Sequence, residues 1–263
     1  RDYKVTGVQT CALPISWGQM NVDIVIESTG HFTSMDGAMK HIAAGAKKVI
    51  ISAPAKTDDV KTVVLGINDH LLDGTEKVIS NASCTTNCAS PMIKIIHDLC
   101  EVESCYVSTV HSYTGDQRLH DAPHPDLRRS RAAALSIIPT TTGAAKAITR
   151  IFPELEGKVG GCGIRVPVPD GSLTDITFIV KKPISVNAIN KAFHDKSKAE
   201  LKGILDYTED PVVSVDCIGN KHSCVFDAQL TSVIGNMVKI VGWYDNEGGY
   251  SARLVDLVKK ISA

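Results

Sequence analysis

VDIVIESTG, the stretch at residues 22–30, decides the fold class. Four of its first six residues are β-branched and apolar, which predicts a buried strand, and Ser-Thr-Gly ends that strand. Residues 34–44 repeat apolar side chains on one helical face and stop at Gly45. Residues 49–54 bring a second β-branched run. Strand, helix and strand in succession predict a βαβ unit and therefore a parallel sheet.

The same patterns extend along the chain. An apolar helix is expected to begin near Ser83 and run through residues 91–99, because Pro91 is tolerated only in the first turns of a helix. The polar, proline-containing residues 116–131 predict a long loop. A βα segment up to about Ser83 and a longer α+β segment after it indicate two domains. The other expected elements are strands at 63–67, 77–80, 105–113, 173–182 and 237–243, and helices at 143–152, 186–200 and 251–261.

Composition excludes several classes of protein. Of the 263 residues, 43% are hydrophobic and 22% are charged, which excludes intrinsic disorder. A net charge of −1 argues against binding nucleic acid or a membrane surface through a global field. No apolar run approaches the ~20 residues of a membrane-spanning helix. The eight cysteines are scattered, without a CxxC pair or a Cys/His cluster, so we expect free thiols, no metal site and a cytoplasmic location.

Cys84 is the first candidate for chemistry. It lies in SNASCTTNC, residues 80–88, between an expected strand and an expected helix. A cysteine at a helix N-terminus meets exposed N–H groups and the positive end of the helix dipole, which lower its pKa and favour the nucleophilic thiolate. The alternative is that Ser83 caps the helix and Cys84 is incidental.

His111 is the second candidate, because a nucleophilic thiolate needs a base or a cationic partner. It stands at the end of an expected strand, where the sites of open sheets gather, although a lone histidine can equally be a core residue. Hydroxyls and arginines follow in Thr114, residues 128–131, residues 140–143 and Arg165. Together they suggest a phosphorylated substrate, whereas singly they fit a solvated basic loop and a helix cap.

Seven motifs in order, between residues 17 and 263, resemble one enzyme family. They are IESTG at 26–30, ASCTTNC at 82–88, HSYT at 111–114, DLRRSRAAA at 126–134, IIPTTTGAAK at 137–146, RVP at 165–167 and WYDNE at 243–247. The family is that of the phosphorylating glyceraldehyde-3-phosphate dehydrogenases. The resemblance implies NAD-dependent oxidative phosphorylation of glyceraldehyde 3-phosphate to 1,3-bisphosphoglycerate in glycolysis, through a thioester.

The resemblance also implies residue roles. Cys84 would be the nucleophile and His111 the general base. Thr114 and Arg165 would bind the phosphate of the substrate. The aldehyde and inorganic phosphate would meet Ser83, Thr85, Arg129, Thr142 and Gly143. The cofactor, NAD in preference to NADP, would lie against Thr29, Gly30, Ser52 and Asn246.

The architecture implied by the resemblance is an α/β fold with two domains. Residues 17–83 with 247–263 would form a partial Rossmann-type dinucleotide-binding (NAD-binding) domain, onto which the last helix packs. Residues 84–246 would form an α+β catalytic domain with a mixed or antiparallel sheet. The loop at 116–138 would lie at a subunit interface of a homotetramer.

The chain departs from the family pattern at its start. No GxGxxG turn occurs, and roughly the first quarter of the family's chain is absent, so the sequence is expected to be N-terminally truncated. Residues 1–16 have no strand or helix period, and 5–15 resemble the translation of a sequencing adapter, so we interpret them as an artefact. Alternatives are therefore an inactive truncated product, an erythrose-4-phosphate dehydrogenase on the same fold, and a Cys/His hydrolase or acyltransferase.

Overall fold

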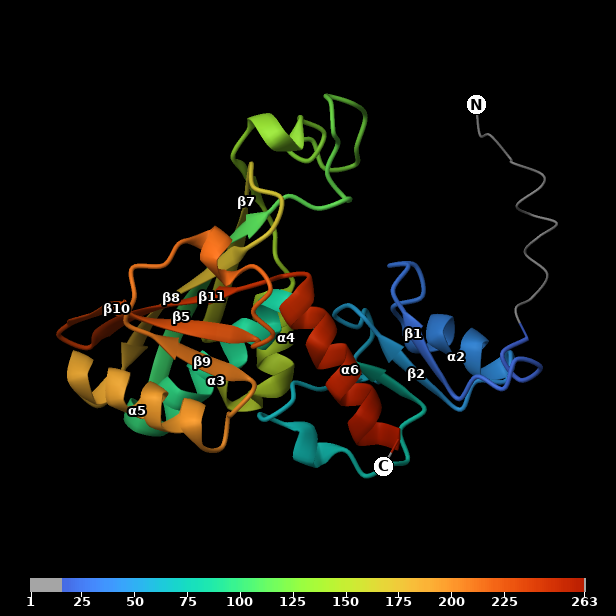
Figure 1. Ribbon diagram of the computed structural model, residues 1–263, viewed down its shortest axis with the longest axis horizontal. Helices are drawn as coiled ribbons and strands as arrows, with labels where there is room; N and C mark the ends of the chain where they lie inside the picture. The colour runs from blue at the N-terminus through green and yellow to red at the C-terminus, as the bar shows by residue number, and fades with distance from the viewer. Residues whose placement is uncertain (1–15, 263) are drawn as a thin grey trace.

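Residues 16–262 are described by a computed structural model, in which two β-sheets are flanked by helices (Figure 1). The smaller sheet has four parallel strands in the order β1 (Ile24–Glu27), β2 (Lys48–Ile51), β4 (Val78–Ser80) and β3 (Lys61–Thr62). The predicted βαβ unit is thus confirmed, with α2 (Met35–Ala43) as its helix.

Both faces of the smaller sheet are covered. Val49 and Ile51 of β2 pack with α2, whereas Ile50 between them packs with Leu254 and Leu257 of α6 (Gly248–Ser262). This alternation is the two-residue period of a strand buried on both sides. Figure 1 shows α6 beside the smaller sheet although it is the last helix of the chain. The C-terminal helix therefore joins the first βαβ unit.

The larger sheet has seven strands and mixed pairing. Neighbours are parallel at β7–β5 and β10–β9 and antiparallel at the other pairings. The mixed sheet predicted for this part of the chain is confirmed. The strand order is β6 (Ile138–Thr140), β7 (Val159–Val166), β5 (Val102–Ser112), β8 (Ser172–Val180), β11 (Met237–Tyr244), β10 (Cys224–Ile234) and β9 (Leu205–Thr208).

The largest apolar core lies under the larger sheet. It joins buried side chains of the sheet to α3 (Cys84–Cys100), α4 (Ala144–Ile151) and α5 (Val186–Lys198). Four short 3-10 turns complete the elements, at Asp69–Leu71, Ala133–Leu135, Pro153–Leu155 and Ser214–Cys217. The long loop between β5 and β6 projects away from the body of the molecule in Figure 1. No helix in residues 16–262 is long and apolar enough to cross a membrane.

Several sequence-based expectations need correction. Residues 63–67 form a turn rather than a strand, because the Asn68 side chain accepts the Val64 N–H and draws the chain round. Pro91 lies inside α3 rather than in its first turn, although the helix begins where expected. Strands β6, β7, β9 and β10 were not predicted. The interpretation of residues 1–16 as an artefact falls outside the described residues, except at Ser16.

Candidate active site

The start of α3 places Cys84 beside His111. Ser83 caps the helix, since its Oγ accepts the Thr86 N–H at 3.1 Å, and Cys84 is the first helical residue. His111 lies near the end of β5, and its Nε2 is 3.3 Å from Cys84 Sγ. The predicted cap and the predicted cysteine–histidine pair therefore coexist, so they were not alternatives.

Burial determines the charge of this pair. It raises the pKa of the Cys84 thiol to about 11. Burial, together with the nearby Arg165 guanidinium, lowers the pKa of His111 to about 4. Both shifts disfavour the charged forms of the two side chains. The lowered cysteine pKa expected from the helix N-terminus is wrong for this state, because loss of solvation outweighs the helix dipole.

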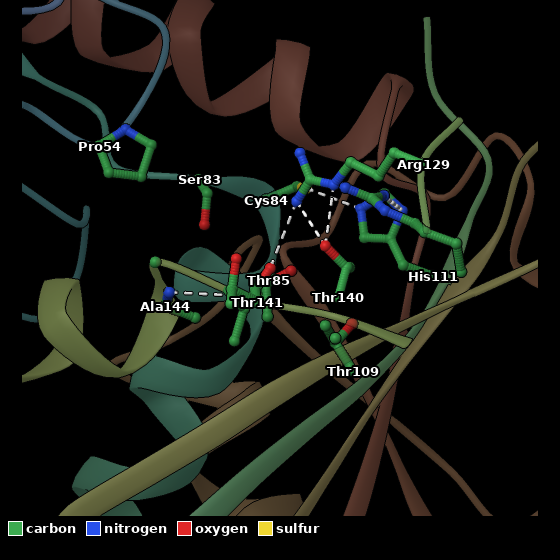
Figure 2. A pocket seen from close by; sticks show the side chains of 14 residues that line it. Pro54, Ser83, Cys84, Thr85, Thr109, His111, Arg129, Thr140, Thr141 and Ala144 are labelled. Atoms are coloured by element: carbon green, nitrogen blue, oxygen red, sulfur yellow. Dashed lines mark hydrogen bonds between the residues drawn. The ribbon is translucent and has the colours of Figure 1, made fainter. Parts of the chain in front are cut away.

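A cavity of about 220 Å³ opens onto Cys84 and His111 (Figure 2). In Figure 2 the start of α3 lies on one side of this cavity, with Arg129, Thr140 and Ala144 around its rim. Thr114 is not among the lining residues, and its backbone N–H donates to Gln117 Oε1 instead. Eight predicted residues line the cavity, namely Ser83, Cys84, Thr85, His111, Arg129, Thr142, Gly143 and Arg165.

Two arginines supply positive charge to the cavity. Arg129 is fixed at the rim by Thr140 Oγ1, which accepts its Nε–H at 2.8 Å, and by an ion pair with Asp116. Arg165, from β7, lies deeper and donates to the Ser112 carbonyl at 3.1 Å while its Nη1 also contacts His111 Nδ1. Guanidinium groups suit phosphate oxygens, so the cavity fits an anionic ligand.

The start of α4 forms the opposite wall. Gly143 is the residue before the helix, and Thr142 Oγ1 accepts the Ala144 N–H at 3.2 Å. One exposed N–H of the helix is thereby already satisfied. Thr142, Gly143 and Ala144 all line the cavity, so the start of this helix borders the space a ligand would fill.

Tyr244 and Thr109 were missed as site residues. The Tyr244 hydroxyl is buried and lies 2.9 Å from both Thr85 Oγ1 and Thr109 Oγ1, and burial raises its pKa above the usual value. This bridge ties β5, β11 and the start of α3 together behind Cys84. Tyr244 stands inside the quoted motif at 243–247, but nothing in the sequence pairs it with two threonines.

The residues predicted to hold a cofactor lie at the carboxyl ends of the parallel strands. Thr29 and Gly30 follow β1, and Ser52 follows β2. The buried Glu27 carboxylate fixes this turn by accepting the Thr29 N–H at 2.8 Å and contacting His41 Nε2 at 2.7 Å. Gly30 has a φ of +76°, which glycine adopts without strain.

Asn246 lies apart from that turn but next to the Cys84–His111 pair. Its Oδ1 accepts hydroxyl hydrogen bonds from Ser112 at 3.0 Å and Ser172 at 2.7 Å, which leaves the amide N–H groups for a ligand. Asn81, after β4, is fully buried, and its amide has no hydrogen-bond partner within residues 16–262. The Asn246 amide is therefore the one of the two that a ligand can reach without displacing core side chains.

Other binding chemistry is not apparent in the described part of the chain. Between residues 16 and 262 no three His, Cys, Asp or Glu side chains are grouped as metal ligands would be. All seven cysteines in that range are free thiols.

Comparison with known proteins gives one consistent result. Residues 83–246 match the family model described as "Glyceraldehyde 3-phosphate dehydrogenase, C-terminal domain". A glyceraldehyde-3-phosphate dehydrogenase of Mycobacterium avium is 56% identical over 94% of this chain and 72% of its own length. The enzyme of Mycobacterium leprae is 52% identical over 97% of this chain and 75% of its own. Glyceraldehyde-3-phosphate dehydrogenase 2 of Streptomyces avermitilis is 55% identical over 92% and 73%.

Proposed function

Since the chain belongs to the glyceraldehyde-3-phosphate dehydrogenase family, we propose that it oxidises and phosphorylates glyceraldehyde 3-phosphate to 1,3-bisphosphoglycerate. The reaction is NAD-dependent and passes through a thioester on Cys84. The observation that carries this proposal is the 3.3 Å contact of Cys84 Sγ with His111 Nε2 in a cavity lined by Arg129 and Arg165.

The first step uses Cys84 and His111. As Cys84 Sγ bonds to the aldehyde carbon, its proton passes to His111 Nε2 and the aldehyde oxygen becomes an alkoxide. Oxidation of this hemithioacetal leaves a thioester on Cys84. An oxygen of inorganic phosphate then attacks the thioester carbon, and the Cys84 thiolate leaves and recovers a proton. His111 Nε2, 3.3 Å from Cys84 Sγ, is within reach of the proton in the first transfer.

The two phosphate groups meet different residues. Arg165, with Thr114 from the start of the neighbouring loop, binds the phosphate of the aldehyde. Inorganic phosphate binds at the rim between Arg129 and the start of α4, where Thr142 and Gly143 lie with Ser83 and Thr85 opposite. Both positions offer the guanidinium and N–H donors that phosphate oxygens accept.

The cofactor residues lie on two sides of the site. Asn246 would hold the carboxamide of the nicotinamide ring, and Ser112 and Ser172 fix the orientation of the Asn246 side-chain amide. Thr29, Gly30 and Ser52 line the remainder at the ends of β1 and β2. When bound, the nicotinamide accepts the hydride that leaves the substrate carbon. We assign NAD rather than NADP from the resemblance alone.

The test is a spectrophotometric assay of the purified 263-residue chain. Reduced cofactor should form at 340 nm with glyceraldehyde 3-phosphate, NAD and inorganic phosphate, more slowly with NADP, and only as a single turnover without phosphate. Faster turnover of erythrose 4-phosphate in the absence of inorganic phosphate would identify the chain as an erythrose-4-phosphate dehydrogenase. Turnover of a thioester or ester substrate without any nicotinamide would identify a hydrolase. Absence of both activity and NAD binding in a titration would contradict the proposal.

We further propose that the active form is a homotetramer in which the loop between β5 and β6 lies between subunits. The support is a set of strongly exposed apolar side chains on that loop, which a monomer has no reason to present to water. They are Leu119, Leu127, Leu135 and Ile137.

A further inference from the structure

The residue two positions before Cys84 has an unusual backbone conformation. Ala82 lies between β4 and α3 with a φ of +55°, in the left-handed region, and it is fully buried. This region disfavours an L-residue by roughly tenfold relative to right-handed backbone, and glycine is its usual occupant. Between residues 16 and 262 two other non-glycine residues have a positive φ, the exposed Asn21 and Glu101 at the end of α3. Ala82 is the one of the three that lies in the core.

Hydrogen bonds from two elements hold Ala82 in this conformation. Its N–H donates to Ser80 Oγ at 3.1 Å, and the Ser80 hydroxyl in turn donates to the Ala53 carbonyl at 2.7 Å. Its carbonyl accepts the Tyr250 hydroxyl at 3.0 Å. Ser80 ends β4, whereas Tyr250 belongs to α6, the last helix of the chain. Both polar backbone groups of this buried residue are therefore satisfied by side chains.

The peptide groups on either side of Ala82 are held as well. Asn87, in the first turn of α3, donates through Nδ2 to the Asn81 carbonyl at 2.9 Å and to the Ser83 carbonyl at 3.0 Å. The carbonyls of residues 81, 82 and 83 thus each accept a hydrogen bond from a side chain. Strained backbone persists where its surroundings specify it in this way, and such residues concentrate at functional sites. The bend directs the chain from β4 into α3, whose first residue is Cys84.

We propose that the left-handed conformation of Ala82 orients Cys84 toward His111, and that Tyr250 and Ser80 are positioning residues that maintain it. The inference rests on the proposed function only for the role of Cys84 as the nucleophile. Because Cys84 follows Ala82 by two residues, rotation about the Ala82 backbone moves Cys84 Sγ relative to His111 Nε2, which lies 3.3 Å away.

Tyr250 connects this conformation to a distant part of the sequence. Its helix is anchored on the smaller sheet by Leu254 and Leu257, which pack with Ile50 of β2. The hydroxyl remains a donor at neutral pH because burial raises the pKa of Tyr250 to about 12. Without that hydroxyl the buried Ala82 carbonyl loses its partner, so the left-handed conformation loses part of its advantage over the right-handed one.

Alkylation of Cys84 by iodoacetamide tests this role, with the Cys84 peptide followed by mass spectrometry. Tyr250→Phe removes only the hydroxyl, and alkylation should become about two- to tenfold slower, the range that one hydrogen bond spans in an equilibrium. The pH of half-maximal alkylation should rise, because Cys84 Sγ moves away from His111 Nε2. The matched control Tyr207→Phe, whose hydroxyl pairs with Glu209 outside the cavity, should keep the wild-type rate and pH profile.

A second substitution separates positioning from a general loosening of the fold. Glycine adopts left-handed backbone without strain, so Ala82→Gly added to Tyr250→Phe should restore most of the wild-type alkylation rate. Ala82→Gly alone should alkylate at nearly the wild-type rate. A slow Tyr250→Phe that glycine does not restore would overturn the proposal, because the contacts of the hydroxyl with Ser52 and Asn81 do not act through Ala82. A wild-type rate in Tyr250→Phe would overturn it directly.

Ser80→Ala gives the same test at the other backbone group, and it decides the matter if Tyr250→Phe does not fold. The substitution removes the acceptor of the Ala82 N–H, so alkylation should again slow and Ala82→Gly should again restore it. An unchanged rate, or a loss that glycine leaves in place, would refute the role of Ala82.

These readouts need neither a cofactor nor turnover, so the two proposals fail separately. A chain in which glycine restores alkylation, but which never oxidises the aldehyde, refutes only the proposed function. A chain that oxidises the aldehyde, and in which Tyr250→Phe and Ser80→Ala both alkylate at the wild-type rate, refutes only this inference.

Discussion

Burial raises the pKa of Cys84 and lowers that of His111, so loss of solvation disfavours the charged form of each side chain. The 3.3 Å contact between Cys84 Sγ and His111 Nε2 gives the thiol proton a short path to the imidazole.

The first prediction concerns the nucleophile. Cys84→Ser should abolish aldehyde oxidation, because the hydroxyl that replaces the thiol is a far weaker nucleophile beside this base. Formation of reduced cofactor at 340 nm measures the loss. Cys162→Ser is the matched control, since Cys162 is a half-buried thiol on β7 outside the cavity lining, and it should keep wild-type rates. Persisting turnover in Cys84→Ser would remove the thioester from the mechanism.

The second prediction concerns pH and stability. His111 has a lowered pKa of about 4 in the folded chain, so the unfolded state binds a proton more readily between pH 6.5 and 4. The contribution of His111 to the free energy of unfolding is therefore fully present above about pH 6.5. As the pH falls to about 4, this free energy should decrease by about 3 kcal/mol in total. Urea unfolding of wild type and His111→Gln across this range measures the effect.

The comparison isolates His111, because the carboxylates that titrate in the same range are common to both proteins. The variant should lose less stability than wild type on acidification. Parallel stability curves would mean that His111 is not kept neutral by its surroundings. In the active chain the same variant should also slow oxidation by ~10² or more, as loss of a general base does.

At the scale of elements, α3 and β11 pack closely because Gly242 on β11 has no side chain. A Cβ on Gly242 would lie 2.6 Å from Cys224 Sγ and 2.8 Å from Met92 Sδ, with Cys88 Sγ at 3.3 Å. The glycine thus lets the helix that carries Cys84 approach the strand that carries Tyr244. The geometry behind the nucleophile depends on this close approach.

Gly242→Ala should therefore destabilise the fold by about 1–3 kcal/mol, the usual cost of overpacking a filled core. Thermal unfolding followed by circular dichroism measures it. Adding Cys224→Ala removes the nearest sulfur, so the double variant should lose less than the sum of the single losses. Gly115→Ala, which has open space around its Cα, should be nearly neutral. Additive losses in the cycle would show that the added methyl group does not conflict with the Cys224 sulfur of β10.

The sequence predicted those elements whose apolar side chains repeat regularly within one short stretch of the chain. The βαβ unit, α3 and α6 carry clear apolar faces, and Ser83 marks the start of α3 at the level of one residue. Strand β7 was missed because its Gly160 and Gly161 look like a turn. They are small because β5 lies against them, where a Cβ would meet the Tyr106 ring at 2.7 Å and the Val107 carbonyl at 2.9 Å.

The same limit applies to the site. Cys84 and His111 were found from local rules, a helix start and a strand end, and the structure brings them together. Tyr244 and Ser172 were not found, because their roles arise from pairings between strands far apart in sequence. The cysteine pKa was predicted in the wrong direction because a local rule, the helix dipole, cannot report how much protein surrounds the sulfur.

At the scale of the whole molecule, the site joins the two sheets. Cys84 follows the smaller sheet through β4, whereas His111 and Arg165 belong to the larger one. The C-terminal helix closes the arrangement, since α6 packs on the smaller sheet and the Tyr250 hydroxyl donates to the Ala82 carbonyl at 3.0 Å.

In a monomer, the loop between β5 and β6 exposes large apolar side chains to water. Leu127 and Leu135 are 81% and 82% exposed, and both lie on the segment that contributes Arg129 to the cavity rim. Burial of such side chains between copies would stabilise an assembly by about 25 cal/mol for each Å² removed from water. It would also restrain the loop and so hold Arg129 in place.

The last prediction follows from this surface. Sedimentation velocity should show wild-type chain as an oligomer, and Leu127→Asp with Leu135→Asp should shift it towards monomer, because burying two carboxylates in an apolar contact is costly. The matched control Val255→Asp changes an exposed apolar residue on α6 and should leave the assembly intact. Alkylation of Cys84 in the double variant should proceed at the wild-type rate if the loop acts only in assembly. A monomeric wild type at micromolar concentration would contradict the homotetramer and leave the exposed leucines as a contact for a different protein.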